Sequence, residues 1–157
     1  MARALSLVAR QALNASETGE AFIVLLTIDH PNLAVPIRVG SDAVDTLSRG
    51  ETFVAFPFDL RLPDDSGDRT PRASLSIDNV DRRIVQAIRA ITSAPSVTIE
   101  IVRAGDADTV EAAFPAFTFT DLSYDALTVS GSLTLESFAA EPYPAATFTP
   151  SRFRGLF

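Results

Sequence analysis

The chain has 157 residues, of which 46% are hydrophobic and 21% are charged, a balance typical of a single soluble globular domain. Twenty acidic side chains outnumber thirteen basic ones and give a net charge of −7, which argues against sequence-specific or backbone binding of nucleic acid. The absence of cysteine excludes disulfides, thiolate nucleophiles and zinc–sulfur or iron–sulfur centres. No apolar run approaches the length of a membrane span, so no membrane insertion is expected.

Apolar residues near the N-terminus recur at intervals of three and four, which predicts a short amphipathic helix over residues 4–15. Arg3 and Arg10 interrupt the apolar run, so the segment does not resemble a signal peptide. An isolated helix of this length is marginally stable, and we therefore expect it to pack against the rest of the chain.

Residues 21–29 are apolar at both alternating sets of positions, which predicts a strand covered on both faces, by its own domain or by a neighbour. Phe22 and Val24 lie on one of these faces. A turn at residues 30–32 and a return strand over 35–39 complete a first hairpin. Residues 40–50 are polar and are expected to form a loop with at most one helical turn.

Alternation over residues 52–62 predicts a strand in which Pro57 marks an edge position or a bulge. The alternation resumes over 72–78 after a dense turn signal, so the two segments form a second hairpin with a long charged tip at 63–71. A helix over residues 80–92 should follow, since a regular apolar stripe ends before a proline.

The second half of the chain has the alternating pattern of antiparallel strands with one buried face, at residues 97–101, 117–120 and 127–136. A turn at residues 104–106 separates the first of these from the rest. The expected fold is therefore mainly β, an antiparallel β-sandwich or split barrel with one flanking helix and the short N-terminal helix. Residues 1–137 would form this single domain.

Residues 138–157 have a different character, because three prolines forbid a helix or a central strand there. Aromatic residues recur at intervals of about five along this segment: Phe138, Tyr143, Phe148, Phe153 and Phe157. The pattern predicts an extended C-terminal arm, which either wraps its own domain or crosses to a neighbouring subunit.

Catalytic and metal-binding groups are scarce. His30 is the only imidazole, and it is expected to be exposed in a turn, because no serine has the glycine pattern of a nucleophile elbow. The acidic turn at residues 64–68 lacks the alternating oxygen ligands and the distal glutamate of an EF-hand, so an ordinary hairpin tip is expected there and also around Asp106 and Asp108. The sequence therefore predicts no enzyme and no cofactor.

Several charged residues suit a contact between subunits. Four arginines could form a basic patch, and four aspartates would lie near it: Arg72, Arg82, Arg83 and Arg89, with Asp59, Asp64, Asp65 and Asp68. This mixture of charges fits one half of a charged subunit contact better than a phosphate-binding groove.

An ordered set of short segments spans nearly the whole chain. It comprises Glu17-Thr18-Gly19-Glu20, Val24-Leu25-Leu26-Thr27-Ile28, Pro36-Ile37-Arg38-Val39, Phe56-Pro57-Phe58, Leu62-Pro63-Asp64-Asp65, Arg72-Ala73, Ile77-Asp78-Asn79-Val80-Asp81-Arg82, Tyr143-Pro144, Phe148-Thr149-Pro150, Phe153 and Gly155-Leu156-Phe157. In this order and spacing the segments resemble an uncharacterised-domain family encoded in the tail modules of long-tailed bacteriophages and prophages. Arg154 departs from the proline expected before the final Gly-Leu-Phe.

The resemblance implies a minor tail protein of the virion, assembled in the host cytoplasm, with a β-sandwich or split barrel and one flanking helix, and with no catalytic residues. The role expected from it is a distal-tail-like adaptor that joins the tail tube to the hub as a ring of identical copies, sixfold in preference to threefold. Its partners would be itself, the tail tube or terminator protein, the tape measure protein and the hub or tip proteins. The residues expected to make these contacts are Phe22, Val24, Asp64, Asp65, Arg72, Arg82, Arg83, Phe138, Tyr143, Phe148, Phe153 and Phe157.

Two other functions stay open. The first is a threefold hub or baseplate subunit of the same tail tip. The second is a receptor- or carbohydrate-binding module, against which the absence of tryptophan and the presence of only two tyrosines count. A hydrolase acting on the cell wall is disfavoured by the missing cysteine and the single histidine.

Overall fold

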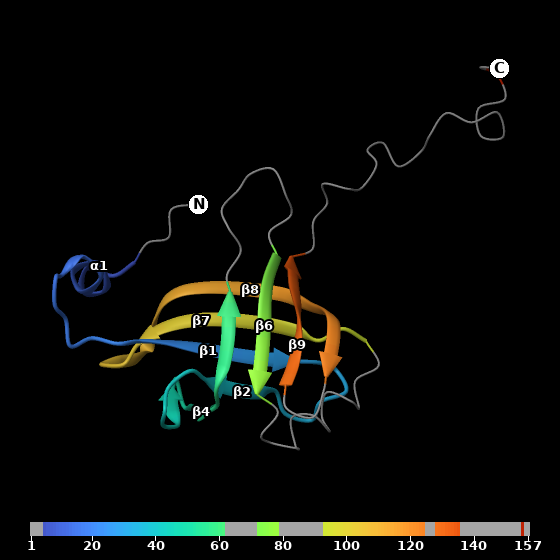
Figure 1. Cartoon of the computed structure of the whole chain (residues 1–157), viewed down its shortest axis with the longest axis horizontal. Helices are drawn as coiled ribbons and strands as arrows, with labels where there is room; N and C mark the ends of the chain where they lie inside the picture. The colour runs from blue at the N-terminus through green and yellow to red at the C-terminus, as the bar shows by residue number, and fades with distance from the viewer. Residues whose placement is uncertain (1–4, 62–71, 79–92, 125–127, 136–154, 156–157) are drawn as a thin grey trace.

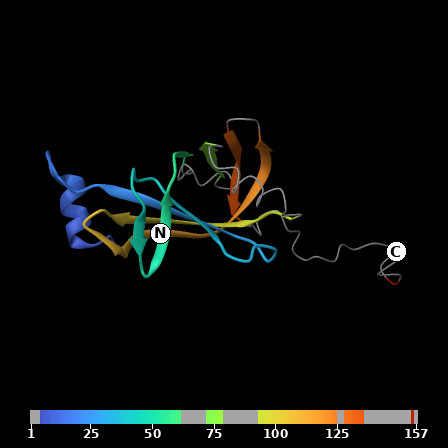
Figure 2. The same cartoon turned by 90° about the horizontal axis from the view of Figure 1, so that it is seen from below.

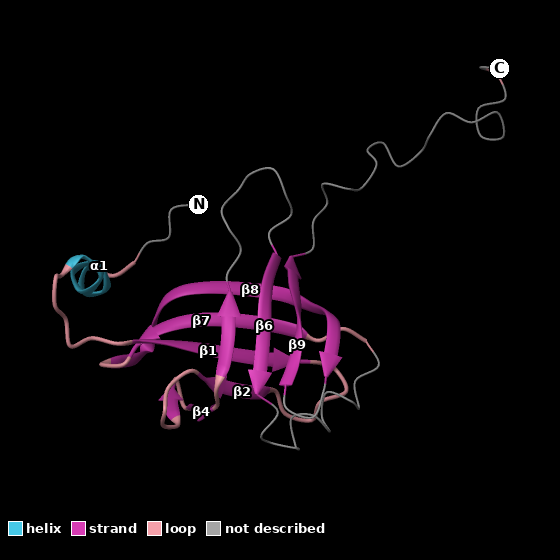
Figure 3. Cartoon of the chain, in the orientation of Figure 1, coloured by secondary structure: helices cyan, strands magenta, loops and turns pink. Residues whose placement is uncertain are grey.

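A computed structural model describes residues 5–61, 72–78, 93–124, 128–135 and 155 of the chain (Figure 1). These residues form a mainly β structure, as the alternation in the sequence predicts (Figure 3). The predicted tip at 63–71, the helix at 80–92 and, apart from Gly155, the arm at 138–157 lie outside the described residues.

The described part begins with helix α1 (Leu7–Asn14), which confirms the predicted N-terminal helix. No helix in this part of the chain is long and apolar enough to span a membrane. The strands that follow are β1 (Phe22–Asp29), β2 (Ile37–Gly40), β3 (Thr46–Ser48), β4 (Glu51–Ala55), β5 (Phe58–Arg61), β6 (Arg72–Asp78), β7 (Ser96–Arg103), β8 (Asp106–Tyr124) and β9 (Thr128–Leu135).

The strands are arranged in two layers that cross at a steep angle. The hydrogen-bonded order is β3-β4-β2-β1-β7-β8-β9-β6-β5. In Figure 1, β6 and β9 run across β1, β7 and β8. Strand β8 has 19 residues and pairs first with β7 and then with β9, so it belongs to both layers. Breaks in its pairing register accompany this course, as expected where a strand bends.

The larger core lies between the two layers. One layer contributes buried residues from β1, β2, β7 and the first part of β8, and the other from β6, β9 and the second part of β8. The residues are Leu26, Ile28, Val39, Val97, Ile99, Ala112 and Phe114 on one side, and Ala73, Leu75, Ile77, Phe117, Phe119 and Leu133 on the other, with Phe56 from the segment that joins β4 to β5. The predicted alternation of β6, β7, β8 and β9 is confirmed by this burial.

A smaller core covers the opposite face of β1. Ile23 and Leu25 of β1 pack there with Phe53 of β4 and Val102 of β7. Leu25 and Leu26 are therefore adjacent in sequence, fully buried, and members of different cores. The prediction that this strand is covered on both faces is confirmed, and the same chain provides both covers.

Two predictions about residues 40–62 are wrong. The segment 52–62 is not one strand, because β4 pairs with β2 and β3 whereas β5 pairs with β6. The chain changes layers at Pro57, which has no N–H to donate, and whose carbonyl accepts from Asp78 N at 3.2 Å. The polar segment 40–50 includes strand β3, whose partner β4 follows it after a two-residue turn.

The turn is tight because Arg49 and Gly50 both have positive φ, 51° and 81°. This is the geometry of the primed turns that suit two-residue hairpins.

Candidate functional site

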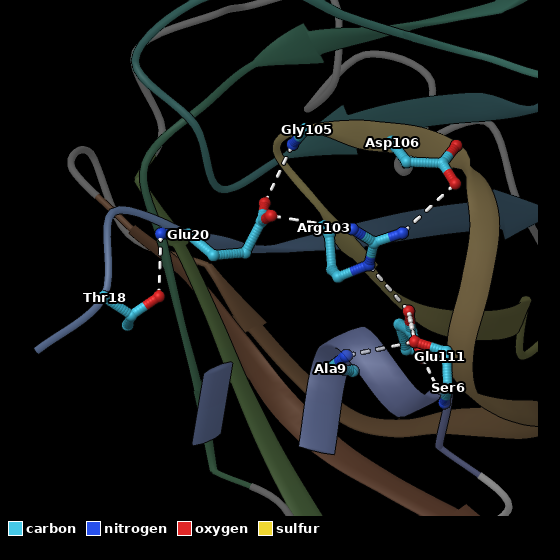
Figure 4. A network of polar contacts seen from close by, with 8 residues as sticks. All are labelled: Ser6, Ala9, Thr18, Glu20, Arg103, Gly105, Asp106 and Glu111. Atoms are coloured by element: carbon cyan, nitrogen blue, oxygen red, sulfur yellow. Dashed lines mark hydrogen bonds and ion pairs between the residues drawn. The ribbon is translucent and has the colours of Figure 1, made fainter. Parts of the chain in front are cut away.

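The densest polar cluster of the described residues surrounds Arg103, near the end of β7 (Figure 4). Its Nε donates to Glu111 Oε1 at 2.8 Å, its Nη2 lies 3.2 Å from Asp106 Oδ2, and its Nη1 lies 3.5 Å from Glu20 Oε2. The Arg103 side chain is 12% exposed and that of Glu111 is 1% exposed. Three carboxylates, one from the segment before β1 and two from β8, thus converge on one guanidinium. The hydrogen bond to Glu111 is the main reason that the pKa of Arg103 is raised.

Glu111 connects this cluster to α1. Ser6 is the N-cap residue of the helix, and its Oγ accepts from Ala9 N at 3.1 Å. The Ser6 hydroxyl also donates to Glu111 Oε1 at 2.7 Å, and Ser6 N donates to Oε2 at 2.8 Å. A negative charge at a helix N-terminus is electrostatically favourable. These hydrogen bonds, that of the Ser6 hydroxyl first, together with Arg103, lower the pKa of Glu111 against the opposing effect of burial.

Glu20, in the segment before β1, binds the turn between β7 and β8. Its Oε1 accepts from Gly105 N at 2.9 Å, and its own N donates to Thr18 Oγ1 at 3.1 Å. A Cβ at position 105 would lie 3.2 Å from Glu20 Oε2, so glycine suits this close approach. The Arg103 cluster therefore holds α1, the segment before β1 and the β7–β8 turn together at one end of the sandwich.

A second cluster joins the β3–β4 hairpin to β7 and β8. Arg49 makes a two-pronged hydrogen-bonded ion pair with Glu100 of β7, and the hydrogen bond to Glu100 is the main reason that its pKa is raised. The backbone N of Arg49 donates to Asp108, and Ser48 Oγ donates to Ala107 O at 2.6 Å. Asp108 thus binds a backbone N–H, and Asp106 binds Arg103, which agrees with their expected roles in an ordinary hairpin.

His30 is buried, with 5% of its surface exposed, and the expectation of an exposed turn histidine is wrong. Its Nδ1 accepts from Asn32 N at 3.0 Å, and its Nε2 lies 2.6 Å from Ser93 Oγ. Because Nδ1 accepts a hydrogen bond, the neutral ring carries its proton on Nε2 and donates to Ser93. A general base would need a free Nε2 lone pair to take the serine proton. The His30–Ser93 pair therefore holds the turn after β1 to the segment before β7.

The described residues contain no group of three or more histidine or carboxylate side chains that could hold a metal ion. All buried side-chain nitrogen and oxygen atoms in this part of the structure have a hydrogen-bond partner. The chemistry of the two arginine clusters is thus that of ion pairs between segments of the same chain.

Among the residues predicted to contact other subunits, the structure describes both the backbone and the side-chain burial of two. Phe22 and Val24 are half-buried in β1, and Val24 packs against the larger core. Arg72 begins β6, opposite Thr134 of β9. The others lie outside the described residues: Asp64, Asp65, Arg82, Arg83, Phe138, Tyr143, Phe148, Phe153 and Phe157.

Sequence reasoning did not identify Ser6, Arg103 or Glu111. A signal was available for the first, since a serine before an apolar periodic segment is a helix N-cap. Glu111 stands out as a carboxylate between Val110 and the apolar residues that follow it, although its partner 105 residues earlier could not be read from the sequence.

The fold and the two clusters define a mainly β domain of two crossed layers, in which ion pairs and hydrogen bonds fix the short N-terminal helix and the β3–β4 hairpin to the central strands. Residues 8–148 match the family model described as "Domain of unknown function (DUF1833)", and the chain belongs to this family. No curated protein matches the chain.

Proposed function

We propose that the chain is a structural subunit of the tail tip of a long-tailed bacteriophage, where a ring of copies joins the tail tube to the hub. The observation that carries this proposal is the agreement between the fold and the resemblance drawn from the sequence. The resemblance implies a β-sandwich or split barrel, and the described residues form two crossed β layers around one main core.

The way in which the ionic groups are used also supports a structural role. Arg103 and Arg49 each bind carboxylates from distant parts of the chain, and thereby fix α1 and the β3–β4 hairpin to the central strands. A ring subunit needs such rigidly held peripheral elements, because they meet the neighbouring copy.

The test is to purify the particles released by the bacterium that encodes the chain. The protein should be present in them, in about six copies per particle when its peptides are quantified against those of the hub. Three copies would favour a hub or baseplate subunit instead. Particles made without the gene should lack functional tails, and supplying the wild-type gene in trans should restore them. Infectious particles that contain no trace of the chain would refute the proposal.

A further inference from the structure

The outward side of α1 carries a regular strip of exposed residues. Leu7, Arg10 and Leu13 follow each other at intervals of three, so they lie on successive turns along one side of the helix. Leu7 is 63% exposed and Leu13 is 58% exposed, whereas Ala9 is buried against the domain. Arg10 is exposed and forms no ion pair within the described residues. We call these three residues the outer strip of α1.

The β3–β4 hairpin has an exposed face of matching composition. Leu47 of β3 is 65% exposed and Val54 of β4 is 48% exposed. Asp45, which is also exposed, lies beside Val54 because its Oδ1 accepts from Ala55 N at 2.8 Å. Asp45 has no ion pair in the part of the chain that the structure describes. We call Asp45, Leu47 and Val54 the outer face of the hairpin.

The two surfaces are held rigidly, each by a different arginine cluster. The Ser6–Glu111 hydrogen bonds fix the start of α1, and the Arg49–Glu100 ion pair fixes the turn of the hairpin. Figure 2 shows α1 and the β3–β4 hairpin as separate projections from the sandwich. Aliphatic side chains on rigid, projecting elements have little freedom to turn inward, so contact with another surface is what would remove them from water.

We infer that the outer strip of α1 in one copy docks on the outer face of the β3–β4 hairpin in the next copy. Each surface presents two aliphatic side chains and one charge, and the charges are opposite, Arg10 on the helix and Asp45 on the hairpin. The lengths of the two surfaces also agree. Leu7 and Leu13 are separated by about 9 Å along the helix axis, and a strand segment of two or three residues, as in the outer face of the hairpin, spans about 7–10 Å.

The occupant is a second copy because the same chain carries both halves of the match. A head-to-tail contact uses two different patches of each subunit, and repeating it around an axis closes a ring. Copies that each carry a net charge of −7 repel one another, so a local attraction between Arg10 and Asp45 would also set their orientation. This inference rests on the proposed function, in which copies of the chain form a ring.

The chain contains no cysteine, so introduced cysteines report the contact directly. Leu7→Cys and Leu47→Cys are made in separate full-length proteins, mixed, oxidised and analysed on non-reducing gels. We expect a disulfide-linked dimer in the mixture, at least several-fold more abundant than in either protein alone. The matched control is Leu7→Cys mixed with Val35→Cys, because Val35 is 66% exposed but lies in the loop between β1 and β2.

Light scattering on the unmodified chain distinguishes a failure of this contact from a failure of the proposed ring. If the chain assembles and the Leu7–Leu47 mixture gives no more dimer than the control, this contact is refuted while the ring stands. If the chain stays monomeric at every concentration and no cross-link forms, both the contact and the ring are refuted.

A charge variant tests the same contact without chemical cross-linking. Arg10→Glu should lower the assembled fraction several-fold, more strongly at low than at high salt, whereas Arg10→Lys should retain most of it. Circular dichroism must show that both variants are folded. Equal assembly of the folded Arg10→Glu variant and the unmodified chain would overturn the inference.

Discussion

At the scale of single residues, Glu111 is a carboxylate whose side chain is only 1% exposed and which has polar partners on two separate segments. It binds the backbone and the hydroxyl of Ser6 and the guanidinium of Arg103, although its neighbours in β8 are apolar. A carboxylate can occupy such a position only when its charge is compensated by hydrogen bonds and by an opposite charge. Arg103 keeps two other carboxylate partners, so the cluster does not depend on Glu111 alone.

Replacing Glu111 by Gln should lower the free energy of unfolding by about 1–2 kcal/mol, since charge-assisted hydrogen bonds are lost from a buried site. Urea denaturation would measure this. The matched control is Glu51→Gln, which removes the partner of Arg38 from an ion pair in which the Glu51 side chain is 56% exposed, and should cost less than about 0.5 kcal/mol. Equal effects of the two substitutions would contradict the assigned role of Glu111.

The lowered pKa of Glu111 also predicts a dependence on pH. The stabilisation is fully present above the unfolded-state value of about 4.3. It is lost as the pH falls through the lowered pKa of the folded state. The difference in unfolding free energy between the unmodified chain and Glu111→Gln should therefore be constant from pH 7 to about pH 5 and shrink below about pH 4. A difference that grew on acidification would show that the pKa shift has the opposite sign.

At the scale of elements, the contact between β8 and β9 depends on a glycine. Gly131 of β9 pairs with Leu75 of β6, and the ring of Phe119 in β8 lies against it. A Cβ there would lie 2.5 Å from Phe119 Cε2 and 2.9 Å from the carbonyl oxygen of Thr120. The second of these atoms belongs to the backbone of the sheet and cannot move independently.

Gly131→Ala should therefore destabilise the fold by about 1–3 kcal/mol, the usual cost of overpacking a core. Gly19→Ala is the control, because a Cβ at Gly19 has no atom within 4 Å. Thermal unfolding of the two variants measures the contrast. If both melted at the same temperature as the unmodified chain, the close packing of Phe119 on Gly131 would be wrong.

Local periodicity predicted most of the elements, and it failed where the chain changes direction without changing its pattern. Val54, Phe56 and Phe58 continue one alternation through Pro57, so the sequence resembles a single strand. Phe56 is nevertheless buried in the larger core while Val54 is exposed, because the chain passes from one layer to the other between β4 and β5. Which strands become neighbours depends on contacts across the whole chain, and local pattern does not contain that information.

The candidate site was predictable only in part. The aliphatic residues of α1 and the lack of a serine elbow are visible in the sequence. The hydrogen bonds of Arg103 to Glu111, and of Ser6 to Glu111, join residues that are 8 and 105 positions apart. The burial of His30 is not visible in the sequence for a related reason. Its turn is polar, and its partner Ser93 lies 63 residues away in the chain.

At the scale of the whole molecule, the described strands end at Leu135, so residues 138–157 supply none of them. If the aromatic arm crosses to a neighbouring subunit, deletion of residues 138–157 should leave the sandwich folded. The same deletion should abolish ring formation, because several aromatic contacts per subunit would be lost around the ring. Circular dichroism measures the first result and light scattering the second. Assembly of the shortened chain into rings would refute the role of the arm in assembly.

The strand order also determines when the protein can fold during its synthesis. Strand β1 pairs with β7 as well as with β2, and β6 pairs with β9 as well as with β5. Strand β9 is synthesised about 50 residues after β6. At the translation rates of cells, this interval corresponds to several seconds. During that time β6 has an unpaired edge outside the ribosome, open to association with other nascent chains. The yield of native protein should therefore depend on the rate at which residues 79–127, between β6 and β9, are translated, and slow codons there would favour aggregation.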